Sequence, residues 1–389
     1  MGADLSASMR TQALRSFGSR RRVLLTADTV GGVWQYAMEL CRALCARGYE
    51  ITLATMGGLP DREQRREAAG IAGLDLRASR YKLLWMDDPW QDVQEAGEWL
   101  LGIAHEVQPD IVHLNDLGHG DLAWPAPVLT VGHSCVLSWW RAVHGERAPE
   151  PQWTRYRERV SAGLHASRLV VAPTQAMMSS LQCFYGPLRN TRIIANGRSP
   201  AAAAPQARKG IIFSAGRVWD EGKNISSLAT IAARVPWPVC IAGPQQSPDG
   251  DNVGFLNVRM LGKLDGEAMR RWFGRASIYA LPARYEPFGL SVLEAAQAGC
   301  ALVLGDIDSL RENWDGAALF VPPGDPDALA FTLQRLIADD TLRTRNMARA
   351  QRRAMHLTPR AMADAYIEAY DGLCLRRRIG ASAMTEMHA

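Results

Sequence analysis

Two glutamates eight residues apart, Glu286 and Glu294, lie in the segment whose residue types are best suited to ligand chemistry. Pro287 and Gly289 oppose helix formation between them. We therefore expect Glu286 on a loop, and Glu294 within the first turns of a helix that begins near Ser291. A helical glutamate that faces a cleft can accept both hydroxyls of a ribose, and a loop glutamate can accept sugar hydroxyls. Backbone amides at the positive end of this helix would bind phosphate or a sugar oxygen, and they belong to Phe288, Gly289, Leu290 and Ser291.

A second loop carries two cations around the predicted start of a helix. Arg217 and Lys223 lie six residues apart, after Gly216 and an apolar run that predicts a strand. A diphosphate is bound by this combination of a guanidinium fork, an ammonium point charge and helix N-terminal amides. A solvated basic loop has the same residues, so this loop alone leaves both interpretations open.

Two further loops follow predicted strands. Gly31 and Gly32 allow the backbone to approach a ligand at a helix N-terminus, although an ordinary tight turn has the same composition. The pair lacks the Gly-x-Gly-x-x-Gly spacing of nicotinamide-binding enzymes. His133 ends an apolar run and is expected at the same edge of the sheet, although a lone histidine is more often structural.

The stretch 134–151 is expected to be rich in loops, and it combines aromatic with cationic residues. Such a loop suits sugar stacking or an anionic acceptor. The acceptor-side candidates in it are Trp139, Trp140, Arg141 and His144. Most of the other tryptophans in the first half of the chain are expected in the core.

The remaining carboxylates give weaker signals. The Asp-x-Asp pairs at 306–308 and 325–327 resemble a metal-binding spacing, but both follow the Glu286–Glu294 segment, and short acidic turns are common. We therefore expect no metal site. Four other carboxylates are interpreted as surface or turn residues, with only the last of them placed to face a cleft: Glu39, Glu50, Asp110 and Asp116.

Apolar runs alternate with segments of helical periodicity along the chain. In the first half, the predicted strands are 21–27, 49–54, 111–114, 127–131 and 169–172, and the predicted helices are 33–47, 93–106 and 153–166. A Pro/Ala-rich stretch, 199–207, predicts a linker. In the second half, the predicted strands are 211–213, 238–242, 278–281 and 301–304, and the predicted helices are 224–233, 265–273, 291–298 and 360–373. This alternation predicts doubly wound parallel sheets, which bind ligands beyond the carboxyl ends of their strands.

Composition and charge exclude several classes of protein. The 389 residues are 47% hydrophobic and 22% charged, enough apolar material for two domains. A net charge of only +4 disfavours a nucleic-acid partner. The seven cysteines are scattered without metal-type spacing, as in a reduced cytoplasmic protein. No apolar run is long enough to cross a membrane, and the arginine-rich N-terminus lacks the apolar run of a signal peptide.

Taken together, these motifs resemble those of retaining glycosyltransferases of family 4, which have the GT-B fold. The segment Glu286–Glu294 resembles the Glu-x7-Glu motif of that family. The other matches are the amino-terminal glycine loop at Gly31-Gly32, the diphosphate clamp at Gly216-Arg217 with Lys223, and the Asn-Gly that closes the first domain at Asn196-Gly197. In chain order they span about residues 22–300.

The resemblance implies an α/β protein of two Rossmann-like domains that face each other across a cleft. Nucleotide would be held by the carboxy-terminal domain and acceptor mainly by the amino-terminal one. We expect a basic disordered tail at 1–20, an acceptor-side domain at 21–200, a sugar-nucleotide domain at 201–356, and at 357–389 a helix that crosses back to the first domain, followed by a tail.

The resemblance also implies a reaction. A hexose would move from a nucleoside diphosphate sugar, UDP- or GDP-sugar being favoured, to a hydroxyl of a saccharide or lipid-linked acceptor in polysaccharide or glycoconjugate biosynthesis. Retention through front-face attack needs no covalent enzyme nucleophile. Arg217 and Lys223 would bind the diphosphate, Glu294 the ribose, and Glu286 with His133 the transferred sugar. Asn196 is carried over as a further donor-binding residue.

Several alternatives stay open from the sequence alone. A sugar-nucleotide epimerase or a phosphorylase would keep the fold and change the reaction. A catalytically silent sugar- or nucleotide-binding scaffold would keep the fold and lose the reaction. We expect a cytoplasmic enzyme without cofactor or metal, and the basic termini leave open a weak association with an anionic membrane surface.

Overall fold

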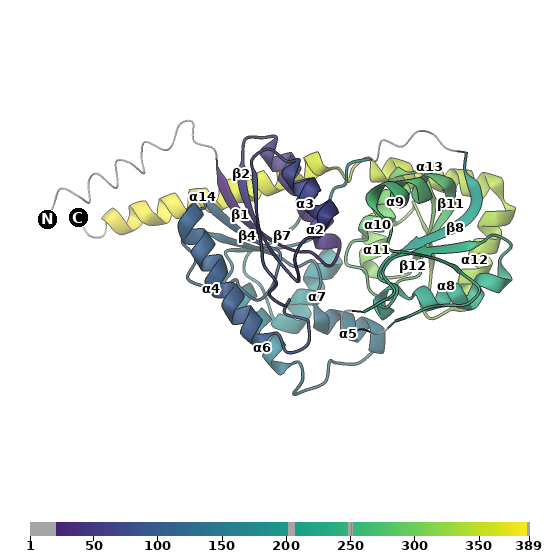
Figure 1. Cartoon of the computed structure of the whole chain (residues 1–389), viewed down its shortest axis with the longest axis horizontal. Helices are drawn as coiled ribbons and strands as arrows, with labels where there is room; N and C mark the ends of the chain where they lie inside the picture. The colour runs from purple at the N-terminus through teal and green to yellow at the C-terminus, as the bar shows by residue number, and fades with distance from the viewer. Residues whose placement is uncertain (1–20, 201–206, 248–249, 251, 387–389) are drawn as a thin grey trace.

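The computed structural model describes residues 21–200, 207–247, 250 and 252–386, and within them the chain forms two α/β domains side by side (Figure 1). Each domain is built on one sheet. The strand orders are β3-β2-β1-β4-β5-β6-β7 in the first and β10-β9-β8-β11-β12-β13 in the second. All pairs between these strands are parallel, so the prediction of two doubly wound parallel sheets is confirmed.

The first domain contains seven strands and six of the described helices. The strands are β1 (Arg22–Asp28), β2 (Glu50–Met56), β3 (Leu74–Ala78), β4 (Ile111–Leu114), β5 (Val128–Val131), β6 (Leu169–Ala172) and β7 (Thr191–Ile193). The helices are α2 (Gly32–Cys45), α3 (Arg62–Ala69), α4 (Trp90–Val107), α5 (Val136–His144), α6 (Thr154–Ala166) and α7 (Gln175–Tyr185). The strand order reverses between β1 and β4, which is where an open sheet binds its ligand.

The second domain is likewise a parallel sheet whose strands alternate with helices. Its strands are β8 (Lys209–Ala215), β9 (Val239–Ala242), β10 (Arg259–Gly262), β11 (Ala276–Leu281), β12 (Ala301–Gly305) and β13 (Leu319–Val321). Its helices are η2 (Glu221–Lys223), α8 (Ile225–Ile231), η3 (Ala232–Arg234), α9 (Gly266–Arg275), α10 (Leu290–Gln297), α11 (Asp308–Trp314), α12 (Pro326–Ala338) and α13 (Asp340–Ala354). The order reverses here between β8 and β11, so the loops after these strands lie at the cleft.

Both faces of the first sheet are buried. Alternate residues of β1 point to opposite faces, and Val23 and Leu25 pack in one hydrophobic cluster with α2, whereas Leu24 packs in another with α4. Burial on both faces explains why these strands are continuous apolar runs, which made them predictable from the sequence.

The last helix, α14 (Pro359–Glu386), packs against the first domain although it follows the second in the chain (Figure 1). Its buried tyrosines, Tyr366 and Tyr370, belong to the same cluster as α2. The chain enters this helix by passing Gly197, where an added Cβ would lie 2.1 Å from the carbonyl oxygen of Thr358. Only glycine permits this approach.

The expected loop at 134–151 is wrong in part, because residues Val136–His144 form the helix α5. This segment contains neither proline nor glycine, and the helix ends where Gly145 takes a left-handed conformation at its C-cap. The predicted tail at 1–20 and most of the predicted linker, residues 201–206, lie outside the described residues. Among the helices of the described chain, none is both long enough and apolar enough to span a membrane.

Candidate active site

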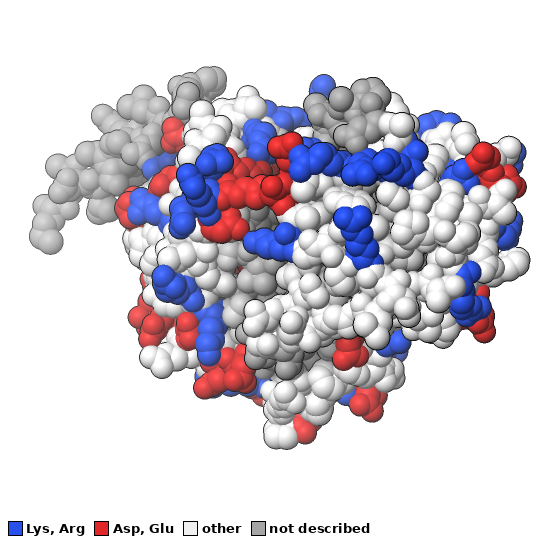
Figure 2. Space-filling model, turned by 45° about the vertical axis from the view of Figure 1, so that its right-hand side comes forward, with Lys and Arg blue, Asp and Glu red and all other residues white. Residues whose placement is uncertain are grey.

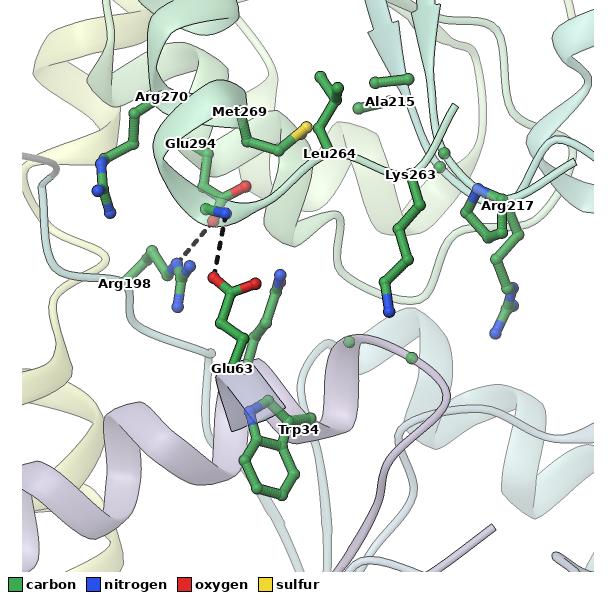
Figure 3. Close-up of a pocket in the computed structure, with 18 of the residues that line it drawn as sticks. Trp34, Glu63, Arg198, Ala215, Arg217, Lys263, Leu264, Met269, Arg270 and Glu294 are labelled. Carbon is green, nitrogen blue, oxygen red and sulfur yellow. Dashed lines mark hydrogen bonds and ion pairs between the residues drawn. The ribbon is translucent and has the colours of Figure 1, made fainter. Parts of the chain in front are cut away.

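A cavity of about 1610 Å³ lies between the two domains. It is lined by the loop after β1, by α2 and α3, by the segment 198–200, and by the ends of β8 and β9 with the start of α9 and one face of α10 (Figure 3). Acidic and basic side chains lie next to each other on the face drawn in Figure 2. The cavity lining is likewise mixed in charge, with Glu63 and Glu67 from α3 and Arg217, Lys263 and Arg270 from the second domain.

Five of the predicted donor-binding residues line this cavity: Gly31, Gly32, Gly216, Arg217 and Glu294. The others are not part of the lining: His133, Asn196, Lys223, Glu286, Phe288, Gly289, Leu290 and Ser291. The two groups are in contact, because a Cβ added to Gly32 would lie 3.4 Å from Leu290 Cδ1. The first domain's glycine loop therefore approaches the N-terminal end of α10.

Glu286 lies on the loop before α10, as Pro287 and Gly289 predict. Its Oε1 accepts hydrogen bonds from the amides of Gly289 at 2.9 Å and Phe288 at 3.4 Å, and its Oε2 accepts one from Lys223 Nζ at 2.7 Å. Gly289 is the N-cap of α10 and has φ +88°, a conformation that favours glycine. The loop geometry thus fixes the Glu286 carboxylate, and Lys223 is held against it with only 15% of its side chain exposed.

Arg217 follows β8, and Asp220 holds it in place. Arg217 Nη2 donates to Asp220 Oδ2 at 2.6 Å, and the other oxygen of Asp220 accepts from the amide of Gly222 and from Trp139 Nε1, both at 2.9 Å. Burial would raise the pKa of Asp220, but the charges of Lys223 and Arg217 lower it, so it is an anion at neutral pH. An aspartate that the sequence did not single out therefore orients the predicted clamp.

Glu294 lies in the second turn of α10 and lines the cavity. Its Oε1 accepts a hydrogen bond from Arg198 Nε at 2.7 Å. Arg198 also reaches Glu39 on α2, which is 4% exposed, so the interpretation of Glu39 as a surface carboxylate is wrong. Arg198 directly follows Asn196-Gly197, but its partners are distant in the chain, so no local pattern indicated this contact.

His133 is partly buried and does not belong to the lining of the cavity. Its Nε2 is 2.8 Å from Asn115 Oδ1, and its ring packs edge-on against Tyr36 with 4.4 Å between centroids. Burial lowers the pKa of His133 to about 3, so the ring is neutral at physiological pH. Asn196 is buried, and its side-chain oxygen has no hydrogen-bond partner within the described residues.

The acceptor-side candidates lie on α5 and do not line the cavity. Trp139 instead joins the two domains through its hydrogen bond to Asp220. Trp140 and His144 pack against each other with 4.5 Å between ring centroids, and Arg141 Nη1 lies 3.5 Å from Cys183 Sγ. The contact of α5 with the second domain continues at Tyr285, whose hydroxyl is 2.9 Å from Ser138 Oγ.

The weaker carboxylate candidates are held by protein groups. Asp116 was expected to face the cleft, but it does not line the cavity; it forms an ion pair with the buried His119, at 2.7 Å. Asp306 pairs with Arg311, and Asp325 caps α12. No cluster of three or more potential metal ligands occurs among the residues that the structure describes.

Comparisons with known proteins agree with this architecture. The family model described as Glycosyltransferase Family 4 matches residues 30–201, and the one described as Glycosyl transferases group 1 matches residues 209–339. The D-inositol 3-phosphate glycosyltransferase of Jonesia denitrificans is 25% identical over 415 residues, which cover 91% of this chain and 93% of that protein. An uncharacterised glycosyltransferase of Methanocaldococcus jannaschii is 23% identical over 354 residues, with 80% and 86% covered.

Solved structures share the fold. Sucrose-phosphate synthase from Thermosynechococcus elongatus matches with a TM-score of 0.74 at 19% identity, over 93% of this chain and 100% of that one. Anabaena HepE, in complex with UDP and glucose, matches with a TM-score of 0.71 at 16% identity, over 91% and 100%. These structures show that the chain has the GT-B fold, as predicted, and the family models show the class of glycosyltransferases. Within that class, the chain belongs to the family-4 type, because the two family models together span most of its length.

Proposed function

We propose that this glycosyltransferase transfers a hexose from a nucleoside diphosphate sugar to a hydroxyl of a saccharide or lipid-linked acceptor, with retention of anomeric configuration. The observation that carries the proposal is the arrangement on the second domain's wall, where a carboxylate, Glu294, and a guanidinium, Arg217, line one cavity. A ribose needs the first and a diphosphate needs the second. UDP and GDP are the favoured donor nucleotides.

The clamp keeps free donors for phosphate oxygens. Lys223 has three N–H groups and gives one to Glu286, which leaves two. Arg217 has five N–H groups, gives one of them to Asp220, and lines the cavity. Both cations would stabilise the negative charge that develops on the diphosphate as the bond to the sugar breaks. Because both are already oriented, little reorganisation is needed at that moment.

The sugar would lie between Glu286, the amides at the start of α10 and His133. A neutral imidazole suits this place, since it can accept or donate a hydrogen bond without adding charge beside the leaving group. Attack by the acceptor hydroxyl on the face that the diphosphate leaves would give retention without an enzyme nucleophile. This scheme requires no cofactor or metal, because the nucleoside diphosphate sugar supplies both the transferred hexose and the leaving group.

Donor identity is tested first by thermal-shift measurements with UDP, GDP and ADP, since a ligand that binds the folded state raises its melting temperature. The nucleotide that stabilises most is then offered as its hexose conjugate with a panel of saccharide acceptors. We expect a glycosylated product and free nucleoside diphosphate. Epimerised donor would indicate an epimerase, phosphate-dependent cleavage a phosphorylase, and binding without turnover a silent scaffold.

Metal independence is tested in the same assay. We expect turnover to continue after the enzyme has been treated with EDTA and exchanged into metal-free buffer. Strict loss of activity, restored by Mg²⁺ or Mn²⁺, would overturn this part of the proposal. Added vesicles with and without anionic lipid test the weak membrane association in a sedimentation assay.

A further inference from the structure

Arg198 lies between two carboxylates from different domains. It belongs to the segment that connects the domains, and its Nε donates to Glu294 Oε1 at 2.7 Å (Figure 3). Its Nη1 donates to Glu39 Oε1 at 3.2 Å. The side chain is 22% exposed, and its remaining surface faces the cavity. One guanidinium therefore joins α2 of the first domain to α10 of the second.

Glu39 has its hydrogen-bonding capacity taken up by protein groups. Besides Arg198, its Oε1 accepts from the amide of Ser199 at 3.4 Å, and its Oε2 accepts from Ser199 Oγ at 2.8 Å. Arg42 Nη1 is 3.6 Å from the same Oε2. With only 5% of its side chain exposed, Glu39 is an anchor for the segment 198–199 rather than a ligand-binding group.

Glu294 differs from Glu39 because half of its carboxylate stays available. Its Oε1 is occupied by Arg198, and its Oε2 has no hydrogen-bond partner among the described residues. Figure 3 shows the second oxygen directed toward the part of the cavity lined by Leu264 and Met269. Arg198 thus fixes one oxygen and leaves the other oriented into the cavity.

Arg198 stays protonated in this position. Burial would lower the pKa of Arg198, but the carboxylates of Glu294 and Glu39 raise it above its ordinary value. The backbone is tied as well, because Gln297 Nε2, one turn beyond Glu294 on α10, donates to the carbonyl oxygen of Arg198 at 2.7 Å. Guanidinium and carboxylate are therefore held in one geometry.

We propose that Arg198, anchored by Glu39, is a positioning residue that presents Glu294 to the donor ribose and thereby sets the preference for a ribonucleotide over a 2′-deoxyribonucleotide. This inference rests on the proposed function, in which Glu294 binds the ribose. A carboxylate with one oxygen held by a guanidinium offers the other at a fixed place, whereas a free glutamate side chain samples several rotamers. Selectivity for the hydroxyl follows from that fixed placement.

The experiment measures dissociation constants by calorimetry for UDP and 2′-deoxy-UDP on the full chain, and for the GDP and ADP pairs if thermal shifts favour those bases. The test variant is the double substitution Arg198→Gln with Glu39→Gln, which removes the guanidinium together with the buried carboxylate that anchors it and leaves Glu294 charged. Glu294→Gln shows the effect of weakening the ribose contact directly. Arg47→Gln is the matched control, since Arg47 pairs with Asp364 and does not line the cavity.

Wild-type protein and Arg47→Gln are expected to prefer the ribonucleotide by about tenfold or more, the usual effect of one hydrogen bond to a charged group. Glu294→Gln and the double variant are expected to fall below about threefold. Arg198→Lys keeps the charge but has a single nitrogen, so it is expected to fold normally and give an intermediate ratio. If the double variant does not fold, Arg198→Lys serves as the test variant in its place.

Each outcome has a separate meaning. A wild-type preference that is unchanged in the double variant, or in Arg198→Lys, overturns the role of Arg198 and leaves the proposed function standing. Wild-type binding without preference for the ribonucleotide overturns the inference as well. If wild-type protein binds none of the three nucleoside diphosphates, the proposed function itself fails, and this inference fails with it.

Discussion

Lys223→Ala tests the diphosphate clamp most sharply, because the ammonium is already in place at 2.7 Å from the Glu286 carboxylate. Its side chain is 15% exposed and that of Glu286 12%, so the pair lies in a partly dry environment where charges act strongly. Removing one preorganised group that stabilises transition-state charge costs about 10²–10³ in rate. We therefore expect kcat to fall at least about a hundredfold.

The same substitution leaves one oxygen of Glu286 without its partner, at a cost of about 1–3 kcal/mol in the free energy of unfolding. The other oxygen keeps its backbone amides, so the loop is expected to hold its shape. Urea unfolding measured in parallel separates lost stability from lost catalysis.

The assay follows release of nucleoside diphosphate at saturating donor and acceptor. Lys82→Ala is the matched control, because Lys82 is exposed, bonds to the carbonyl oxygen of Asp87 and lies away from the cavity. We expect the control to keep wild-type kcat. A folded Lys223→Ala enzyme with kcat within about threefold of wild type would refute the electrostatic role of the clamp.

Three further predictions concern stability, each measured by urea unfolding. Gly197→Ala is expected to lower the free energy of unfolding by about 1–3 kcal/mol or more because of the contact with Thr358. Its control is Gly102→Ala, at a position on α4 with no atom within reach of an added Cβ, which should raise the free energy of unfolding by up to about 1 kcal/mol. Equal effects of the two substitutions would contradict the close approach of Gly197 to Thr358. Trp139→Phe loses its bond to Asp220 and should cost about 1–3 kcal/mol more than Trp140→Phe, whose N–H has no partner among the described residues; no difference would argue against the domain contact. His133 has a pKa of about 3 in the folded state, below its unfolded value of about 6.5, so between these two pH values the unfolded state binds more protons. The free energy of unfolding therefore falls as pH decreases from about 6.5 to about 3, by roughly 1 kcal/mol per pH unit. His133→Gln should reduce this dependence on pH, and an unchanged dependence would show that the ring is not held neutral in the folded state.

The fold was predictable because burial on both faces of a parallel sheet produces apolar runs that a local pattern reveals. The run at β6 (Leu169–Ala172) is buried along its whole length, and the sequence predicted its bounds correctly. The helix α5 was missed because prolines at its C-terminal side suggested a loop for the whole stretch, whereas they begin only after Gly145.

The site was predictable where the chain itself builds it. Pro287 and Gly289 determine the loop that places Glu286, and helical spacing then places Glu294 on α10. The partners of these residues were not predictable, since Arg198 and Glu294 are 96 positions apart and Trp139 and Asp220 are 81 apart. Such contacts depend on how two domains pack, which no local pattern contains.

Retaining transfer from a nucleotide sugar is tested by ¹H NMR of the anomeric protons during turnover. The enzyme is incubated with the α-linked hexose conjugate of the nucleotide that binds best, and with the acceptor panel. We expect the donor's anomeric signal to be replaced by that of an α-glycoside, and we expect Lys223→Ala to slow this replacement at least about a hundredfold. A β-glycoside, or no transfer from any of the UDP, GDP and ADP donors, would contradict it.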